Sequence, residues 1–252
     1  MPRLAWFSPM PPSRSGIAVA SAELVPALRV EHEIDVFADN PADSTARSAH
    51  DFLWEHAKRP YDLVVYQLGN SSFHDYAWPY LFRFPGLAVL HDAHLHHARA
   101  AALLRTRRTG DYRAEFAASH PGVDAAMAEL AVAGFDSHLY YRWPMRRLVV
   151  EASRVTAVHA AGLAEDLREE VPAAVIETIP LAHGEMVEQT RVAAARQRVR
   201  TARGIASDAV LFGVFGALTP EKRLPQVLDA FESVRRYVPA AHLLLAGAAA
   251  AH

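Results

Sequence analysis

The strongest constraint on the fold is a series of short, almost continuously apolar runs that alternate with helix-type segments. Such runs, without an apolar–polar alternation, are typical of parallel strands covered on both faces. The segment 17–28 carries Leu24, Val25 and Leu28 at the helical period. The predicted strands are Leu4–Phe7, Ile34–Phe37, Leu63–Tyr66, Leu87–Leu90, Val155–Val158 and Val175–Ile179. This order predicts an α/β fold with a doubly wound parallel sheet and right-handed crossovers.

The alternation stops between about His94 and Arg147, where the sequence is helical in type. Ala98–Leu104 and Val123–Ala133 are rich in strong helix formers and are separated by glycine- and proline-containing breaks. We therefore expect a helical insertion after the fourth strand.

A second strand–helix–strand pattern begins late in the chain. Val210–Phe215 and Leu243–Ala246 are predicted strands on either side of a helix over Leu224–Tyr237. Two parallel strands with one helix leave sheet edges and a sheet face uncovered. We thus expect a complete Rossmann-like domain over 1–184, a connector with an arginine-rich helix over 185–207, and only the first βαβ unit of a second Rossmann-like domain over 208–252, with the Ala-rich end as a cut edge.

Composition excludes several classes of protein. With no cysteine there can be no disulfide scaffold, thiolate metal site or cysteine nucleophile. The net charge of −2 gives no sign of nucleic acid as a partner. No apolar run reaches the length of about 18 residues that a transmembrane helix needs, and the N-terminus has no signal-peptide core. We expect a cytoplasmic protein.

Ligands of open α/β sheets bind beyond the carboxyl ends of the strands, so the residues after each strand are the candidates for a site. The loop after the first strand leads to Gly16 at a predicted helix N-terminus, where free N–H groups favour anions and glycine permits close approach. A stiff turn with Ser15 as N-cap is the alternative. After the third strand, the polar run Gln67–His74 would suit sugar hydroxyls or phosphate, although Asn70 or Ser71 could instead cap the next helix.

The fourth strand is followed by His91-Asp92-Ala93-His94-Leu95-His96-His97. No two of these histidines have the spacing that places two imidazoles on one helix face as metal ligands. A functional His91 at the strand end is favoured over a metal site, and the other three histidines are expected on a helix surface or partly buried.

The predicted strand 210–215 is followed by Gly216 and then by Thr219, Pro220, Lys222 and Arg223. Thr219 is a good N-cap and Pro220 a good first helical residue. Lys222 and Arg223 would then lie in the first turn, where the helix dipole disfavours cations unless an anion such as a diphosphate binds there. Lys222 is one of two lysines in the chain, with Lys58. A helix start exposed to solvent is the alternative.

A basic cluster falls within the predicted insertion. It is expected to be a solvated face, and it would suit a weak peripheral contact with an anionic membrane surface. Its members are Arg105, Arg107, Arg108, Arg113, Arg142, Arg146 and Arg147.

Together these segments resemble retaining glycosyltransferases of the GT-B fold, family 4. Residues 7–18 are similar to that family's S-P-x-P-P-x-x-S-G-I-A loop, 66–74 to its Y-x-x-G-N followed by a histidine, and 85–92 to its P-G-x-x-V-L-H-D strand end. Residues 215–223 resemble the start of its donor domain, and 179–184 its interdomain stretch. The ordered combination spans nearly the whole chain.

The resemblance implies transfer of a sugar from a nucleotide-sugar donor to a glycan, lipid-linked or small-molecule acceptor, as in the synthesis of cell-envelope polysaccharide. It gives His91 the contact with the transferred sugar near the reacting carbon, and it assigns donor binding to Gly16, Lys222 and Arg223. Sugar or acceptor contacts then fall to Asn70, Ser71, His74 and Asp92. No cofactor and no metal are expected, and the location is the cytoplasm or the inner face of the membrane.

Three departures from the family pattern stand out. Ala217 replaces an arginine that many members have, and Val19-Ala20 replace a polar–aromatic pair. The family's E-x₇-E carboxylate motif does not occur after the donor-domain start, so full donor binding is not expected of these 252 residues. Two other hypotheses stay open: a non-catalytic module that binds a glycan, a lipid or a partner, and a metal-dependent hydrolase built on the histidine cluster.

Overall fold

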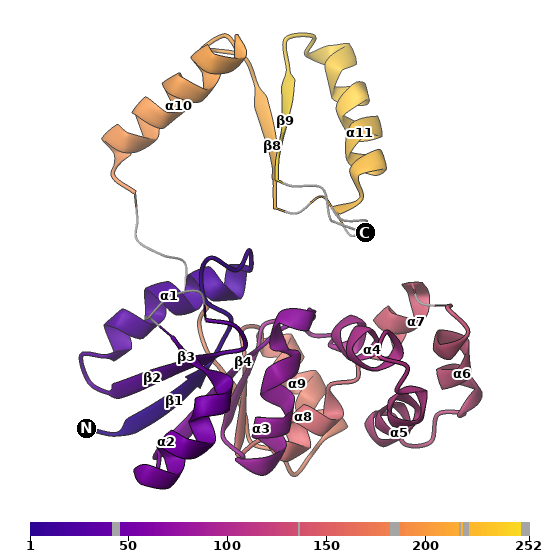
Figure 1. Cartoon of the computed structure of the whole chain (residues 1–252). Coiled ribbons are helices and arrows are strands. Elements are labelled where there is room, and N and C mark those ends of the chain that lie inside the picture. The colour runs from indigo at the N-terminus through magenta and orange to yellow at the C-terminus, as the bar shows by residue number, and fades with distance from the viewer. Residues whose placement is uncertain (42–45, 136, 182–186, 217, 219–221, 248–252) are drawn as a thin grey trace. The chain divides into compact units, whose positions relative to one another are not determined.

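The computed structural model describes residues 1–41, 46–135, 137–181, 187–216, 218 and 222–247 (Figure 1). The chain divides into two compact units, Met1–Gly184 (unit 1) and Glu185–His252 (unit 2). Each unit is described by itself.

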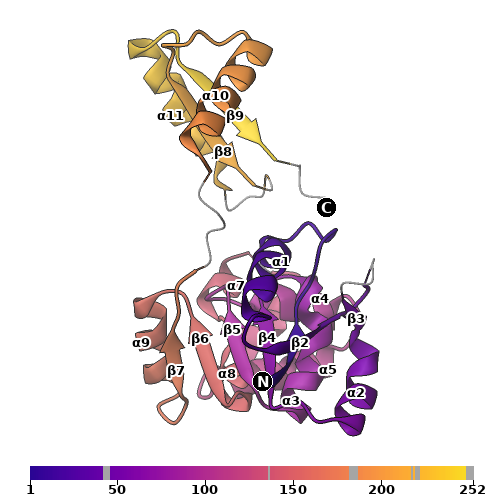
Figure 2. The same cartoon turned by 90° about the vertical axis from the view of Figure 1, so that its left-hand side faces the viewer.

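Unit 1 is built on a parallel sheet of seven strands in the spatial order β3-β2-β1-β4-β5-β6-β7. The labelled strands follow this order across Figure 2, from β7 to β3. The predicted α/β parallel fold is therefore confirmed. The strands are β1 (Arg3–Phe7), β2 (Glu33–Ala38), β3 (Arg47–Ser48), β4 (Leu63–Leu68), β5 (Leu87–Leu90), β6 (Val155–Val158) and β7 (Ile176–Thr178).

Helices cover both faces of this sheet. Ser15 begins α1, because its Oγ accepts a hydrogen bond from the Ile17 N–H at 3.2 Å, which confirms the predicted N-cap. The helical elements around the sheet are α1 (Gly16–Leu28), η1 (Ala49–Asp51), α2 (Phe52–Lys58), η2 (Ser72–Ala77), α3 (Trp78–Arg83), α8 (Arg147–Ala152) and α9 (Ala161–Glu170).

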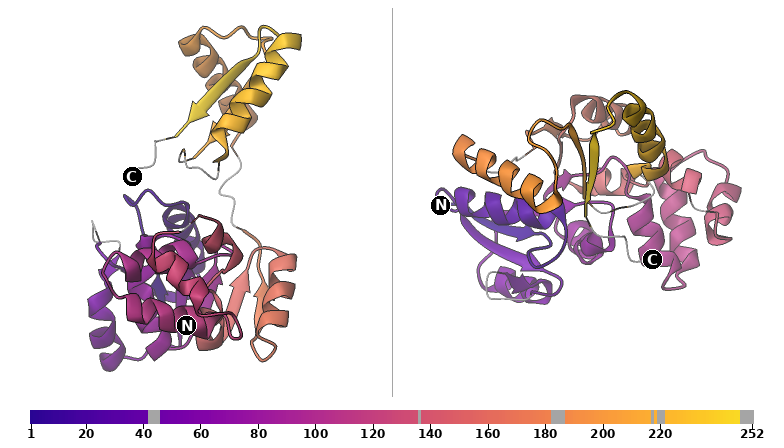
Figure 3. Two further views of the ribbon diagram at one scale, coloured as in Figure 1. Left: turned by 90° about the vertical axis from the view of Figure 1, so that its right-hand side faces the viewer. Right: turned by 90° about the horizontal axis from the view of Figure 1, so that it is seen from above.

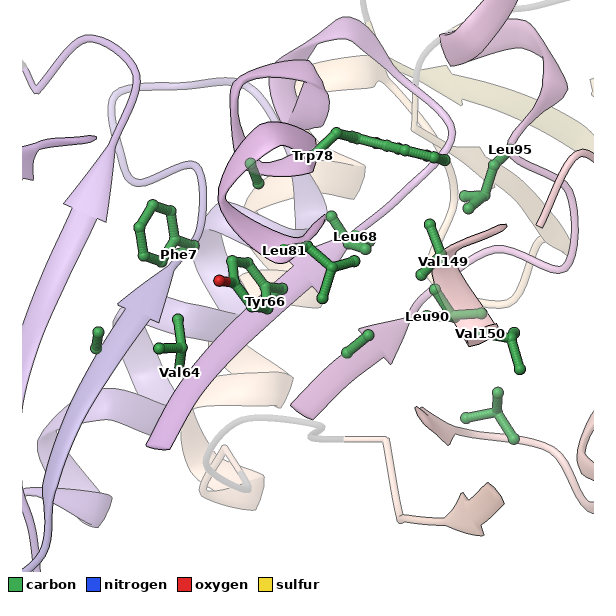
Figure 4. Packing of buried hydrophobic residues seen from close by; sticks show 14 of the residues in the cluster. Phe7, Val64, Tyr66, Leu68, Trp78, Leu81, Leu90, Leu95, Val149 and Val150 are labelled. Atoms are coloured by element: carbon green, nitrogen blue, oxygen red, sulfur yellow. The ribbon is translucent and has the colours of Figure 1, made fainter. Parts of the chain in front are cut away.

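The two faces of the sheet bury two separate apolar clusters. On one face, one apolar cluster includes Phe7 and Tyr66 of the sheet, Leu81 of α3 and Val149 of α8 (Figure 4). Phe52 of α2 and Leu167 of α9 belong to the same cluster. The other face packs against Val25 of α1 through Trp6, Val36, Val65 and Val89. Because successive strand residues point to opposite faces, the apolar runs of the sequence supply both clusters at once.

The helical insertion predicted after the fourth strand gathers at one side of unit 1 (Figures 1 and 3). It has its own apolar cluster around Leu103, Tyr112, Phe116 and Met145. The helices are α4 (His96–Leu104), α5 (Thr109–Ser119), α6 (Ala126–Val132) and α7 (Ser137–Arg142).

Two expectations about the insertion are wrong. His96 is fully buried: its Nε2 lies 2.8 Å from the Tyr112 hydroxyl, and its Nδ1 lies 2.5 Å from the Trp143 carbonyl. Arg146 is 9% exposed and donates to Glu170 and to the Ala93 carbonyl, so it does not belong to a solvated face. His96 therefore joins segments within the insertion, and Arg146 connects the end of the insertion to α9.

Unit 2 contains α10 (Gln189–Arg203), β8 (Leu211–Phe215), α11 (Leu224–Tyr237) and β9 (His242–Ala246). β8 and β9 form a parallel pair, and α11 runs alongside it (Figure 3). Gly204 ends α10 in the left-handed conformation that glycine adopts at helix C-termini. Several apolar side chains of the strand pair are exposed to solvent, and Phe215 is 69% exposed.

Within the described residues, none of the helices combines the length and the apolar character needed to cross a membrane.

Candidate functional site

The topological switch point of the sheet lies between β1 and β4. The chain leaves β1 through α1 toward β2 and β3 on one side, and the strands from β4 onward are added on the other side. The loops after β1 and β4 therefore meet at the carboxyl edge of the sheet. Gly69, directly after β4, marks the meeting point: a Cβ there would lie 2.6 Å from Ile17 Cδ1, 3.0 Å from His74 Nε2 and 3.1 Å from Asp92 Oδ2.

Gly16 is the first residue of α1 and is exposed. A Cβ built on it would meet no described atom within 4 Å. The N-terminal turn of α1 is thus open at Gly16, although Ser15 already accepts from the Ile17 N–H, and the free N–H groups of such a turn are suited to an anion.

Asn70 joins three segments of the chain. Its backbone N–H donates to Asp92 Oδ2 at 2.7 Å, and its side-chain Oδ1 accepts from the Ala98 N–H at 3.0 Å. Its Nδ2 lies 3.1 Å from His97 Nδ1. Asn70 therefore caps α4, the helix that follows β5, and not the helical turn next to it in sequence.

Ser71 and His74 lie beside Asn70 in different surroundings. Ser71 is half-buried at the N-cap of η2, where its side chain makes no capping hydrogen bond with the described chain. His74 is 1% exposed, and its Nδ1 lies 2.9 Å from the Gln67 carbonyl. Burial lowers the pKa of His74, against smaller raising effects of the Gln67 carbonyl and the Asp92 carboxylate.

His91 follows β5 and is half-buried, with both ring nitrogens next to polar atoms of the chain. Nε2 lies 2.7 Å from Gln67 Oε1, and Nδ1 lies 3.2 Å from Nε2 of His159. Burial lowers the pKa of His91 to about 4, with smaller contributions from His159 and His74. His91 is therefore neutral at pH 7 and can accept or donate a hydrogen bond without carrying charge.

His159 is the residue of this site that sequence reasoning missed. It follows β6 directly, as His91 follows β5, and the register pairs Leu90 with Val158. The sequence signal was its position alone, a polar residue immediately after a buried strand.

The histidines after β5 separate rather than converge. His91 turns to Gln67 and His159, His96 enters the core of the insertion, and His97 lies beside Asn70. In the described part of the chain, no group of three or more histidine, aspartate or glutamate side chains is placed to hold a metal ion.

Lys222 of unit 2 lies beside Gly216, whose backbone conformation favours glycine. Gly216 has φ +103°, and its missing Cβ would lie 3.6 Å from Lys222 Nζ. α11 begins at Leu224 with Arg223 as its N-cap residue, so the expectation that Lys222 and Arg223 lie in the first helical turn is wrong. They precede the helix, still at its positive end. The predicted cap Thr219 and first helical residue Pro220 lie outside the described residues.

An open cavity of about 570 Å³ lies between the insertion and α9. Its lining includes His94, Trp143 and Arg142, with Asp166 and Glu170 from α9. Arg142 is exposed, and its guanidinium carbon lies 5.6 Å from the centre of the Trp143 ring. The sequence did not indicate this cavity, because its wall combines segments far apart in the chain.

No family model matches the chain, and no curated protein matches it. Among solved structures it is similar to apo UGT2 of Phytolacca americana, with 11% sequence identity and a TM-score of 0.42. The similarity covers 86% of this chain and 58% of the other, so the chain spans little more than half the length of that protein. Similarity of this degree is too low to assign an activity.

Proposed function

We propose that this chain is part of a retaining glycosyltransferase of the GT-B type, family 4, which transfers a sugar from a nucleotide-sugar to a glycan, lipid-linked or small-molecule acceptor. The observation that carries the proposal is the meeting of three separate motifs at one sheet edge. Gly69 lies against Ile17 of the first motif, His74 of the second and Asp92 of the third.

In this proposal the open N-terminal turn of α1 at Gly16 receives a donor phosphate. His91, neutral at pH 7, offers a hydrogen bond to the transferred sugar near the reacting carbon. Lys222, with Arg223, stabilises the negative charge that develops on the leaving diphosphate, which is the largest electrostatic demand of such a transfer. Retention would follow from attack on the face that the leaving group vacates, with no nucleophile from the protein. No cofactor or metal is assigned.

The acceptor would bind to unit 1. The cavity between the insertion and α9 begins at Ala93 and His94, only a few residues after His91 along the chain. Its indole ring, guanidinium and carboxylates suit the apolar face and hydroxyl groups of a sugar ring. Ser71 and Asp92 would add contacts near the reacting end.

The test exploits the fact that the chain has only two lysines. In a chain that also carries the carboxylate motif, calorimetric titration with UDP- and GDP-sugars should show that Lys222→Ala weakens binding about 10- to 100-fold, the loss of one charge-assisted contact to phosphate. Lys58→Ala is the matched control, since Lys58 is an exposed residue of α2 that pairs with Glu55. Sugar transfer to an added acceptor should fall in the same variant.

Two results would contradict the proposal. Equal affinity of the two variants would remove Lys222 from the donor site. Absence of any nucleotide-sugar binding, together with binding of a glycan to the cavity, would favour the alternative of a non-catalytic module, which the self-contained core of unit 1 would also permit.

A further inference from the structure

The pair formed by His91 and His159 is built by the sheet itself. Each histidine directly follows a strand, and the parallel register of β5 and β6 places the two strand ends side by side. Their ring centres lie 4.8 Å apart, and Nδ1 of His91 is 3.2 Å from Nε2 of His159. The contact joins neighbouring strand ends rather than two flexible loops.

The outer nitrogen atoms of the pair, Nε2 of His91 and Nδ1 of His159, each face an oxygen atom. His91 Nε2 faces Gln67 Oε1 at 2.7 Å, and His159 Nδ1 faces the Ile179 carbonyl at 3.3 Å. With the Gln67 amide in this orientation, both oxygens only accept hydrogen bonds, so each outer nitrogen carries a hydrogen. One further hydrogen is needed between the rings. Three N–H groups on two rings amount to one positive charge on the pair.

In this arrangement the added proton is assigned to His159, because burial disfavours a charge on His91. Burial and the neighbouring imidazoles lower the pKa of His91 to about 4, so His91 stays neutral and accepts at Nδ1 from His159. The other titratable groups here are His74, which also acts on His91, and Asp92, whose carboxylate acts on His74. Two cationic rings at this distance would repel strongly, so the pair holds one added proton and not two.

Removal of the proton from His159 leaves two N–H groups for the same positions. His159 keeps its Nδ1 hydrogen for Ile179, its bare Nε2 accepts from His91 Nδ1, and His91 Nε2 becomes an acceptor. Gln67 satisfies that nitrogen by turning its amide so that the NH₂ group faces His91, a change that hardly alters its shape. The whole series of hydrogen bonds then runs in the opposite direction.

We propose that His159 is a positioning residue that sets the tautomer of His91: protonated His159 holds His91 with its hydrogen on Nε2, and neutral His159 holds it with the hydrogen on Nδ1. Gln67 follows by rotation of its amide. The consequence for sugar transfer rests on the proposed function, because a substrate that replaces Gln67 at Nε2 would meet a donor in one state and an acceptor in the other.

The test is side-chain ¹H–¹⁵N NMR of the full chain labelled with ¹⁵N-histidine, between pH 5 and pH 8.5. In the unaltered protein we expect His91 to change from the Nε2–H to the Nδ1–H form as the pH rises and His159 loses its proton. In His159→Gln, whose amide does not titrate, the tautomer of His91 should no longer change with pH over this range. In His159→Phe the preference should disappear. His94 serves as the internal reference.

A His91 tautomer that does not change with pH in the unaltered protein overturns the proposal without need of any variant. So does a pH-dependent change that persists in a folded His159→Gln protein. The pH profile of kcat for sugar transfer adds a functional readout: the step attributed to the pair should be absent in His159→Gln. Failure to detect any transfer would count against the proposed function alone, since the NMR titration still decides the tautomer.

Discussion

The two units use the same strand–helix–strand pattern with opposite results for burial. All five residues of β1 are buried, whereas none of the five residues of β8 is. Phe7 at the end of β1 is 0% exposed, and Phe215 at the end of β8 is 69% exposed. A local apolar pattern is therefore enough to form a strand, but burial depends on how many layers and neighbouring strands surround it.

The difference is one of coverage rather than composition. β1 pairs with β2 and β4 and lies between helices on both faces, while β8 pairs only with β9 in the described chain. The free energy gained from apolar burial is roughly 25 cal/mol per Å² of surface removed from water. Unit 2 gains much less of it per residue, so we expect unit 1 to carry most of the stability.

Amide hydrogen exchange should show the largest difference. Amides of β1 and β4 should exchange only through global unfolding, and those of β8 and β9 through local opening. Exchange in β8 and β9 should be at least about 1,000-fold faster, since global unfolding costs roughly 5–15 kcal/mol. Equal protection of the two strand pairs would contradict the expected difference in local stability between the two units.

Truncation of a matched pair of phenylalanines should give the next largest effect. Phe7→Ala should lower the free energy of unfolding by about 3–5 kcal/mol, because the ring packs among Phe37, Phe52 and Tyr66. Phe215→Ala should change it by no more than about 0.5 kcal/mol. Urea denaturation followed by circular dichroism, which detects the helices of both units, would measure both. A large cost for Phe215→Ala would mean that unit 2 buries this ring in solution.

A matched pair of glycines should give the smallest difference. Gly69→Ala should cost about 1–3 kcal/mol, since the new Cβ would lie 2.6 Å from Ile17 Cδ1 with His74 and Asp92 close by. Gly213→Ala meets Phe215 Cε2 at 2.7 Å, but that exposed ring can turn away. Urea midpoints would compare the two, and a Gly69→Ala protein as stable as the unaltered chain would contradict the tight packing of the three loops.

The strands that could be predicted are those with continuous apolar runs, and the helix over Leu224–Tyr237 was also found with its bounds. The edge strand β3 was not predicted, because it has only two residues, Arg47 and Ser48, and neither is apolar. The burial of His96 and Arg146 was missed for a related reason. Their partners Tyr112 and Glu170 are distant in sequence, and a local pattern does not show tertiary contacts.

The residues of the candidate site could be predicted where they lie in the loop directly after a predicted strand. Asn70, His91 and Asp92 were found in this way, and the structure brings them to one sheet edge. Their roles with a ligand stay predictions. His159 was missed because its significance depends on the register of β5 against β6, which composition and periodicity do not contain.

The loop that follows β5 is pinned at several points. Asn70 binds Asp92 and the first turn of α4, Arg146 donates to the Ala93 carbonyl, and the Leu95 N–H donates to the Pro144 carbonyl. A segment held in this way forms a fixed wall, and it cannot swing over a ligand as a flap would. Any discrimination between ligands along this wall must therefore come from the ligand's own shape and stereochemistry, measured against a surface that does not adapt.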